Sequence, residues 1–277
     1  MKKIRAVLMD MDGTCLSKSQ VAISMRNMKA IQDAIKAGVH IIPCTGRVFT
    51  MMPPQLLTQE GIRYYVTSHG ARVYDKETGE SLYTDLIPAE EGAKIWEIIE
   101  DKRIYNEVAA EAKIYFEKDV ADNFDMSTIP PHHAWFIQDN WYEAVDKPSK
   151  YFREHNIGIE KMNVYRIPQE LQQEIYDAIT ATGFVSHTRP GAGPNLEFLH
   201  CTLDKLNAVD VVLEKLGLTY EDCMAIGDSV SDYKILQKCG LGVAMGNAPD
   251  DIKAVADVVT GLNTEDGFAE AFEKYVL

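Results

Sequence analysis

The sequence predicts an α/β protein with a parallel sheet at its core and a second, α+β module inserted into that core. Two features of the 277-residue chain support this prediction. Short apolar runs without alternation, which are typical of strands buried on both faces, are followed by stretches of helical periodicity. Between about residues 85 and 190 this alternation stops, and aromatic and charged residues become more frequent. We therefore expect residues 1–84 and 190–277 to form a core domain and residues 85–189 to form an inserted domain.

The first part of the chain is expected to alternate between strand and helix. Gly38 ends the first helical stretch, and such alternation implies right-handed crossovers in a parallel sheet. The turn-forming residues 75–79 lie between two short apolar stretches, which favours a β-hairpin. The predicted strands are 6–9, 39–44, 64–67, 71–74 and 81–84, and the predicted helices are 25–37 and 49–59.

The remaining elements belong either to the inserted module or to the second part of the core domain, residues 190–277, which we call the returning core. In the module we predict helices over 90–101, 141–155 and 169–180, and strands over 104–108, 113–117, 164–167 and 184–187. In the returning core we predict strands over 196–199, 223–226, 241–245 and 258–260, and helices over 202–216, 230–238 and up to residue 275. The renewed alternation of strand and helix is what assigns this last segment to the core.

Composition limits the functions that the chain can have. Lys and Arg number 28 and Asp and Glu number 42, which gives a formal net charge of −14. This balance argues against binding to nucleic acid or to an anionic membrane surface, because both need a basic face. It is compatible with an anionic small molecule, since a metal ion and a few local cations reverse the field within one site.

The cysteines and the apolar segments favour a cytoplasmic protein. The five cysteines are widely spaced and form no C-x-x-C motif, which favours reduced thiols over disulfides or a zinc site. The apolar run before Asp10 is too short for a signal peptide and ends at an acidic residue. No stretch approaches the ~18 consecutive apolar residues of a membrane span.

Two carboxylates follow the first predicted strand. Asp10 and Asp12 are two residues apart, so both can point to one side of the strand end, where open α/β sheets bind ligands. Two neighbouring carboxylates repel each other unless a cation lies between them. Gly13 permits a tight turn directly after them. The alternative is a solvated Asp-Gly turn, which the buried strand before it makes the weaker interpretation.

A possible phosphate site follows the second predicted strand. Thr45, Gly46 and Arg47 offer a hydroxyl, an amide and a guanidinium just before a helix, which suits a phosphate group. A simple helix cap explains Thr45 about as well.

A cation and two more carboxylates occur in the returning core. Lys205 lies in the first turn of a predicted helix, where the helix dipole slightly disfavours a cation; a solvated surface lysine is the ordinary alternative. Asp228 ends a predicted strand as Asp10 does, and Asp232 follows on the same helix face. Carboxylate oxygens suit Mg²⁺, although Asp228 or Ser229 can instead cap the helix.

These four groups of residues resemble the four motifs of the haloacid dehalogenase-like (HAD) superfamily, in the same order. The resemblance covers the whole chain and rests above all on Asp10-x-Asp12-Gly13-Thr14 paired with Gly227-Asp228-x-x-x-Asp232. Residues 245–248, residues 265–269 and the large insert between the second and third motifs are similar to the Cof-type branch with a type IIB cap. The resemblance implies a Rossmann-like HAD core, which is an α/β fold with a parallel sheet, plus an inserted α+β cap domain.

The resemblance also implies a role for each residue. Asp10 would be the nucleophile that forms an aspartyl phosphate, and Asp12 would act as acid and then as base. The residues implied in phosphate binding are Thr45, Gly46, Arg47, Lys205, Ser231 and Asn247. The implied Mg²⁺ ligands are Asp10, Asp12 through its backbone carbonyl, Asp228 and Asp232. Two alternatives stay open: Arg47 reaches the substrate or pairs with a carboxylate, and Asp232 orients Lys205 or a metal-bound water.

Three positions depart from the family pattern. Family members commonly have Asn where this chain has Ser231, Asn where it has His69, and Gly where it has Leu206. We expect these changes to affect phosphate affinity and the shape of the site, and not the covalent chemistry. In the cap, the candidates for substrate choice are His132, His133, Trp135 and Trp141, with packing inside the cap as the alternative.

The sequence thus predicts a Mg²⁺-dependent phosphatase that acts on small phosphorylated metabolites. Sugar phosphates are the first choice of substrate, and pyridoxal phosphate and nucleotides are the alternatives. A phosphomutase, which returns the phosphate to its substrate, and a non-catalytic phosphate- or metal-binding sensor are the rival functions. Asp12 argues against a sensor, because binding alone needs no acid at that position. We expect a monomer or a homodimer.

Overall fold

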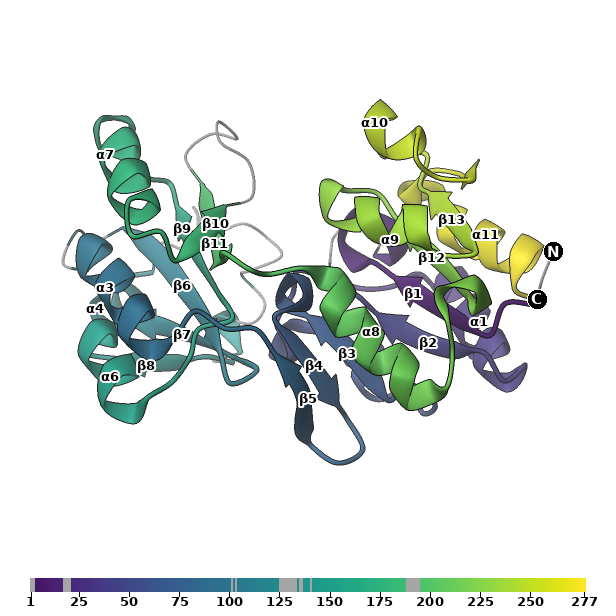
Figure 1. Cartoon of the computed structure of the whole chain (residues 1–277), viewed down its shortest axis with the longest axis horizontal. Helices are drawn as coiled ribbons and strands as arrows, with labels where there is room; N and C mark the ends of the chain where they lie inside the picture. Colours follow the sequence, from purple (N-terminus) through teal and green to yellow (C-terminus); the bar gives the residue numbers. More distant parts are fainter. Residues whose placement is uncertain are drawn as a thin grey trace. The chain divides into compact units, whose positions relative to one another are not determined.

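The computed structural model describes residues 3–16, 21–100, 102, 104–124, 134, 137–139, 141–187 and 195–277. The chain divides into two compact units, each with its own sheet (Figure 1). The first unit comprises Met1–Arg47, Met51–Tyr83 and Asp204–Leu277. The second comprises Val48–Thr50 and Thr84–Leu203.

A five-stranded parallel sheet is the basis of the first unit. Its order is β14-β13-β12-β1-β2, so β1 lies between β12 and β2, with Ala6 aligned to Cys223 on one side and His40 on the other. The strands are β1 (Ala6–Met9), β2 (His40–Pro43), β12 (Cys223–Gly227), β13 (Leu241–Ala244) and β14 (Val258–Val259). Every residue of β1 and β12 is buried, which confirms the fully buried strands expected from runs without alternation.

Helices cover this sheet. They are α1 (Met25–Lys36), α2 (Pro54–Leu57), α8 (Lys205–Leu216), α9 (Tyr233–Lys238), α10 (Asp250–Lys253) and α11 (Gly267–Tyr275). Val209 of α8 and Ile235 of α9 share one apolar cluster with Leu8 of β1 and Ala225 of β12, so these two helices are fixed to the strands that lead into the site. Asp204 begins α8 by accepting a hydrogen bond from the backbone N–H of Leu206 at 3.0 Å.

A small sheet extends the first unit. It contains β3 (Tyr64–Thr67), β4 (Arg72–Asp75) and β5 (Glu80–Thr84), with β3 and β4 antiparallel. The sequence predicted 64–67 as a further strand of the parallel sheet. Instead, a single parallel bridge from Cys44 to Val66 joins this strand to the end of β2.

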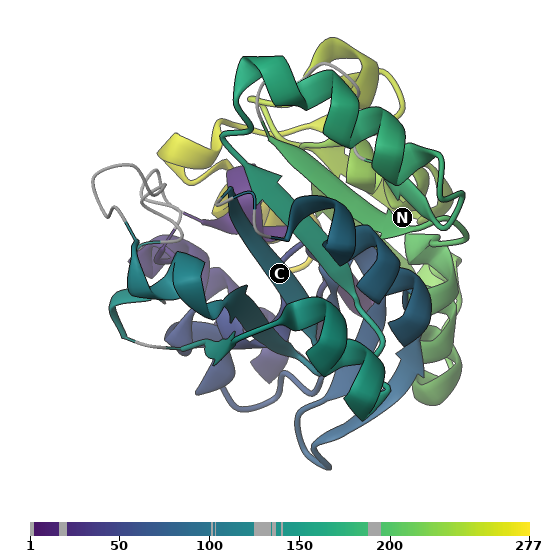
Figure 2. The same cartoon turned by 90° about the vertical axis from the view of Figure 1, so that its left-hand side faces the viewer.

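The second unit is built on a six-stranded sheet of order β10-β11-β9-β6-β7-β8, antiparallel except for the β7–β8 pair. Its strands are β6 (Tyr105–Ala110), β7 (Lys113–Glu117), β8 (Glu143–Val145), β9 (Lys161–Tyr165), β10 (Val185–His187) and β11 (Leu196–His200). Its helices are α3 (Ala89–Ile99), α4 (Lys118–Asp122), α6 (Pro148–His155) and α7 (Gln169–Thr180). Figure 2 looks onto these helices, and Trp96 of α3, Phe152 of α6 and Ile175 of α7 share a core cluster with Met162 of β9.

The α/β fold class with a parallel core sheet and an added antiparallel sheet is therefore confirmed, but, besides the pairing of 64–67, two expected helices and the pairing of one more strand were wrong. The helix expected over 141–155 is strand β8 followed by the shorter α6, because Pro148 occupies the first turn of a new helix. The helix expected over 49–59 is a 3₁₀ turn, Phe49–Met51, and the short α2, separated near Pro53. The strand expected over 196–199 in the parallel sheet pairs antiparallel with β9.

None of the helices in the described ranges is both long enough and apolar enough to cross a membrane.

Candidate active site

The carboxyl ends of β12, β1 and β2 lie side by side, and each leads into a polar segment. Asp10 directly follows β1, and its backbone N–H donates to the carbonyl of Ile226 at 3.0 Å. The backbone N–H of Cys44, after β2, donates to the carbonyl of Met9 at 2.8 Å. Since the strands stay paired up to their last residues, the segments that follow them are held close together at one edge of the sheet.

Three carboxylates converge at this edge. Asp10, Asp228 and Asp232 each offer an oxygen, and these oxygens all lie within 4.8 Å of one another. Burial, followed by the charge of Asp232, raises the pKa of Asp10 well above its usual value. Burial and then the charge of Asp232 also raise the pKa of Asp228, to about 6. A largely buried group of mutually repelling carboxylate oxygens fits a hard divalent cation such as Mg²⁺.

Lys205 is a buried cation beside this group. As the first residue of α8 it is only 7% exposed. Its Nζ donates to Asp232 Oδ1 at 3.0 Å and to the carbonyl of Cys44 at 3.2 Å. Burial alone would lower the pKa of Lys205, but the charges of Asp232 and Asp10 outweigh it and raise that pKa. The lysine is therefore held in its charged form and is not a solvated surface residue.

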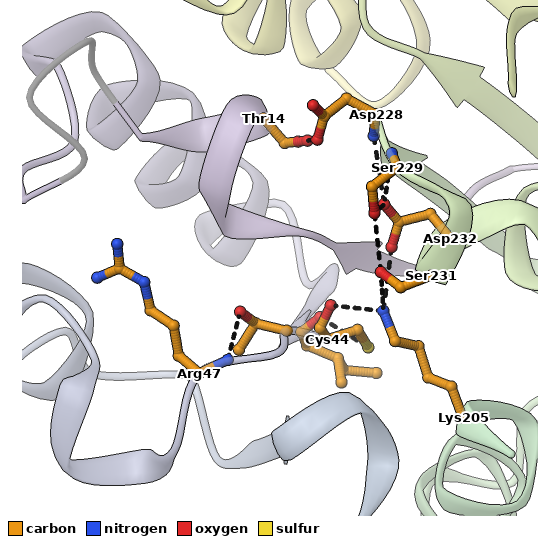
Figure 3. A network of polar contacts seen from close by, with 10 residues as sticks. Thr14, Cys44, Arg47, Lys205, Asp228, Ser229, Ser231 and Asp232 are labelled. Carbon is orange, nitrogen blue, oxygen red and sulfur yellow. Dashed lines mark hydrogen bonds and ion pairs between the residues drawn. The ribbon is translucent and has the colours of Figure 1, made fainter. Parts of the chain in front are cut away.

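Asp232 has two tasks within the fold. One oxygen accepts the hydrogen bond from Lys205, and the other accepts the backbone N–H of Ser229 at 3.1 Å and its hydroxyl at 3.0 Å (Figure 3). The second set of contacts is a capping box that begins the 3₁₀ turn before α9. Ser231 Oγ lies 3.4 Å from Lys205 Nζ and 2.8 Å from Ser229 Oγ. Asp232 thus contacts Lys205, as one of the two alternatives left open by the sequence expects; a contact with a metal-bound water stays untested.

Arg47 pairs with the carboxylate of Asp12 in a two-pronged contact. Its Nε donates to Oδ2 at 2.7 Å and its Nη2 donates to Oδ1 at 2.6 Å, while Nη1 donates to the carbonyl of Met51 at 3.2 Å. The guanidinium is 5% exposed, whereas the side chain of Asp12 is 40% exposed. Of the two alternatives for Arg47, the structure shows the pairing with a carboxylate; contact with a substrate stays a prediction. Asp12 is held with both oxygens directed to one partner.

The loop after β2 is fixed by a second, strained segment. The backbone N–H of Arg47 donates to Thr45 Oγ1 at 3.1 Å, and the N–H of His69 donates to the carbonyl of Thr45 at 3.0 Å. Ser68, His69 and Gly70 all have positive φ angles, which is a strained conformation for the first two. A Cβ on Gly46 would lie 2.5 Å from the His69 ring, so any larger residue here would require that ring to move. The His69 ring thus lies next to Gly46, whose backbone amide is predicted to bind phosphate.

Asp228 is held from two sides. Thr14 Oγ1 donates to Asp228 Oδ1 at 3.0 Å, and Asn247 Nδ2 donates to Asp228 Oδ2 at 3.2 Å. The sequence analysis assigned no role to Thr14, although its place in the first motif could have indicated one. Asn247 was expected near phosphate, and its described contacts are with Asp228, the carbonyl of Gly13 and the backbone of Asn263.

The other sequence candidates lie elsewhere. Leu206 packs against the apolar cluster under α8. Trp141, in the second unit, is 41% exposed. His132, His133 and Trp135 lie outside the described residues.

Comparison with known proteins agrees with this geometry. The sequence profile of the haloacid dehalogenase-like hydrolases matches residues 7–272. The chain is a haloacid dehalogenase-like hydrolase. Its relatives include proteins named as phosphatases and a HAD subclass IIB sugar phosphatase. With them, the chain belongs to the Cof-type, subclass IIB branch of the HAD phosphatases and is a phosphoric monoester hydrolase.

Several relatives of this HAD hydrolase cover almost its whole length. A 5-amino-6-(5-phospho-D-ribitylamino)uracil phosphatase of Bacillus subtilis is 29% identical over 99% of this chain and 96% of its own. A haloacid dehalogenase-like hydrolase from Bacteroides thetaiotaomicron has a TM-score of 0.80 at 25% identity, covering 98% of this chain and 99% of its own. A HAD subclass IIB sugar phosphatase has a TM-score of 0.74 at 25% identity, covering 97% and 98%.

Proposed function

We propose that this HAD hydrolase is a Mg²⁺-dependent phosphatase that cleaves small phosphate monoesters through an aspartyl-phosphate intermediate. The observation that carries the proposal is the convergence of Asp10, Asp228 and Asp232 within 4.8 Å, beside the buried Lys205. Phosphoryl transfer needs an in-line nucleophile and positive charge around the phosphoryl oxygens, and this group of residues offers both.

The reaction proceeds in two displacements. In the first, a carboxylate oxygen of Asp10 bonds to phosphorus while the ester P–O bond breaks, and Asp12 gives a proton to the departing oxygen. In the second, Asp12 takes a proton from water, whose oxygen bonds to phosphorus and releases Asp10 and inorganic phosphate. Lys205, with Thr45 and the amide of Gly46, binds the phosphoryl oxygens.

The residues that hold Mg²⁺ would be Asp10, Asp228 and the backbone carbonyl of Asp12. When bound there, Mg²⁺ neutralises charge on the phosphoryl group and offsets the repulsion between the carboxylates. Asp232 completes the acidic group but uses its oxygens to cap a helix and to hold Lys205.

Two variants test the covalent mechanism with p-nitrophenyl phosphate, whose leaving group needs no acid. Asp12→Asn should release a burst of one nitrophenolate per active site and then turn over slowly, because only the second displacement needs its base. Asp10→Asn should give no burst and should lose roughly 10³-fold or more in kcat. A burst from Asp10→Asn, or normal turnover by it, contradicts an Asp10 nucleophile.

Substrate class and metal dependence need a separate experiment. We propose polyol or sugar phosphates as substrates, since one relative is a sugar phosphatase and another acts on a phosphorylated ribityl compound. Phosphate release from a panel with both compound types, pyridoxal phosphate and nucleotides should be highest for a sugar or polyol phosphate and stop in chelator. Conversion of a sugar phosphate to its isomer without phosphate release would instead identify a phosphomutase.

We further propose that the inserted domain, predicted as residues 85–189 and compact over Thr84–Leu203 in the structure, is a cap that selects the ester, while the core supplies the chemistry. Exchanging this segment with that of a related enzyme should move substrate preference with the cap; preference that stays with the core contradicts this division. We also propose a cytoplasmic location, which fits five cysteines that are all free thiols. A monomer or a homodimer stays the expected assembly.

A further inference from the structure

Asn247 occupies a position in which every hydrogen-bonding group of its side chain is used. It follows β13, in the loop that leads to α10. Its Oδ1 accepts the backbone N–H of Asn263 at 3.0 Å, and its Nδ2 donates to the carbonyl of Gly13 at 2.8 Å and to Asp228 Oδ2 at 3.2 Å. Since the backbone N–H of Asn263 is only a donor, Oδ1 must face it. The amide nitrogen therefore faces the two acceptors, Gly13 and Asp228.

These contacts leave no side-chain N–H of Asn247 for a phosphate oxygen. A primary amide has two N–H donors, and the two acceptors named above take one each. Binding phosphate would require breaking one of these contacts. The family resemblance associates Asn247 with phosphate, but in this chain its side chain donates to the carboxylate of Asp228 instead.

The carboxylate of Asp228 is held by residues from two other parts of the chain. Thr14 donates to its Oδ1 at 3.0 Å, and Asn247 donates to its Oδ2. Gly13, at φ +78°, lies so close that a Cβ there would be 2.2 Å from Asp228 Oδ2. The carboxylate plane therefore has little freedom to rotate.

We infer that Asn247 is a positioning residue, which together with Thr14 fixes the orientation of Asp228 for metal binding. The inference rests on the proposed function in that Asp228 is a Mg²⁺ ligand. Groups that orient a ligand from behind typically contribute 10- to 100-fold to metal affinity. Asn247 then acts on the metal and only indirectly on the substrate.

The test measures Mg²⁺ binding to the full chain by isothermal titration, without substrate. Asn247→Ala should raise the Mg²⁺ Kd by about 10- to 100-fold. Asn247→Asp should raise it further, because two acceptors would then face the new carboxylate. At saturating Mg²⁺, the KM for substrate and the inhibition constant of inorganic phosphate should stay within two-fold of the wild type. The exposed Asn207 of α8 supplies the matched control, and Asn207→Ala should change none of these values.

Thr14 supplies an independent check should Asn247 variants fold poorly. Thr14→Val removes the hydroxyl at nearly constant volume and should weaken Mg²⁺ binding, while Thr14→Ser keeps the donor and should restore most of it. An unchanged Kd in both Asn247→Ala and Thr14→Val overturns the inference, as does a tenfold loss of phosphate affinity at saturating Mg²⁺ in Asn247→Ala.

The proposed function can fail separately from this inference. If the wild type binds Mg²⁺ with one site and Asp228→Ala abolishes it, the metal site stands whatever Asn247→Ala does. If the wild type binds no Mg²⁺, both the metal role and the positioning role of Asn247 are overturned.

Discussion

Arg47 fixes the orientation of the Asp12 side chain. Its buried guanidinium donates hydrogen bonds to both carboxylate oxygens of Asp12, which is the acid and base of the proposed mechanism. A lysine at this position would keep the charge and lose the planar, two-pronged geometry. Orientation is therefore the property that a substitution here changes.

We predict that Arg47→Lys lowers kcat by about 10²-fold, the cost of a misplaced catalytic group. The Mg²⁺ Kd should stay within a few-fold, because Arg47 touches none of Asp10, Asp228 and Asp232 in its described contacts. Steady-state kinetics and metal titration measure the two effects. Arg26→Lys is the matched control, since Arg26 makes the same two-pronged contact with Glu273 on an exposed surface. A normal kcat for Arg47→Lys contradicts the orienting role.

The sequence allowed the residue types of the site to be predicted better than their partners. Asp10 and Asp228 were found because each follows a buried apolar strand, and parallel strands end at one edge. The partner of Arg47 could not be chosen, because Asp12 is 35 residues away in sequence and only the ends of β1 and β2 bring them together. The contacts of Asn247 could not be predicted for the same reason, because only the folded structure brings its partners close to it.

At the scale of elements, the first residue of α8 is the buried cation Lys205, which the dipole of that helix disfavours. The ion pair with Asp232 offsets this cost, and the carboxylate of Asp232 also caps the turn before α9. One ion pair thus joins the starts of two helices that pack on the same face of the sheet.

We predict that Lys205→Met destabilises the protein by about 3–5 kcal/mol, because it leaves Asp232 and Asp10 buried without their cation. Denaturant unfolding in chelator measures this without any contribution from metal. Lys215, exposed at the other end of α8, gives the control: Lys215→Met should change stability by less than about 0.5 kcal/mol. Equal stabilities for the two variants would mean that the Lys205–Asp232 pair adds nothing to the fold.

Two glycines with positive φ show how local backbone and site are connected. Gly13 has φ +78° and lies against the Asp228 carboxylate, whereas Gly217 has φ +62° at the end of α8, where an added Cβ would have nothing within 4 Å. An alanine incurs the left-handed backbone penalty of about 1–2 kcal/mol at either position. Only at Gly13 does it also meet another group.

We therefore predict that Gly217→Ala lowers stability by about 1 kcal/mol and leaves Mg²⁺ affinity unchanged. Gly13→Ala should lower stability by more and should also abolish Mg²⁺ binding, because Asp228 must move to admit the methyl group. Thermal unfolding and metal titration of both variants provide the comparison. Undisturbed Mg²⁺ binding by Gly13→Ala would show that Asp228 does not need its present position.

Helices and strands were predicted correctly where the residue pattern within one segment is enough to define the element. The helix 169–180 was predicted with the bounds that α7 has, and 6–9 with those of β1. It failed where pairing is decided by distant segments: 196–199 is a strand as predicted, but a short apolar run does not show whether its neighbour will be parallel or antiparallel. At 141–155 helical periodicity outweighed Pro148 in the prediction, and in the structure the proline set the start of the helix.

At the scale of the whole molecule, a chain with a net charge of −14 has to bind an anionic ester. The described cations nearest to the carboxylate group, Lys205 and Arg47, are both paired with aspartates. In the proposed mechanism, phosphate binding would therefore need added positive charge, which a divalent ion held by Asp10 and Asp228 would supply. The proposed metal site lies in the first unit, since Asp10, Asp12 and Asp228 all belong to it.

This leads to a prediction on how Mg²⁺ changes stability across the molecule. A ligand at 100 times its Kd stabilises the state that binds it by about 2.7 kcal/mol, and only the unit that carries the site gains this directly. In hydrogen exchange, peptides covering β1 and β12 should become more protected with Mg²⁺ than in chelator, while peptides covering β6 and β7 of the second unit should exchange as before. Asp228→Asn is the control, and its exchange should be the same with and without Mg²⁺. An equal gain in protection in both units would show instead that they unfold as one cooperative body, so that the metal in the first unit also stabilises the second.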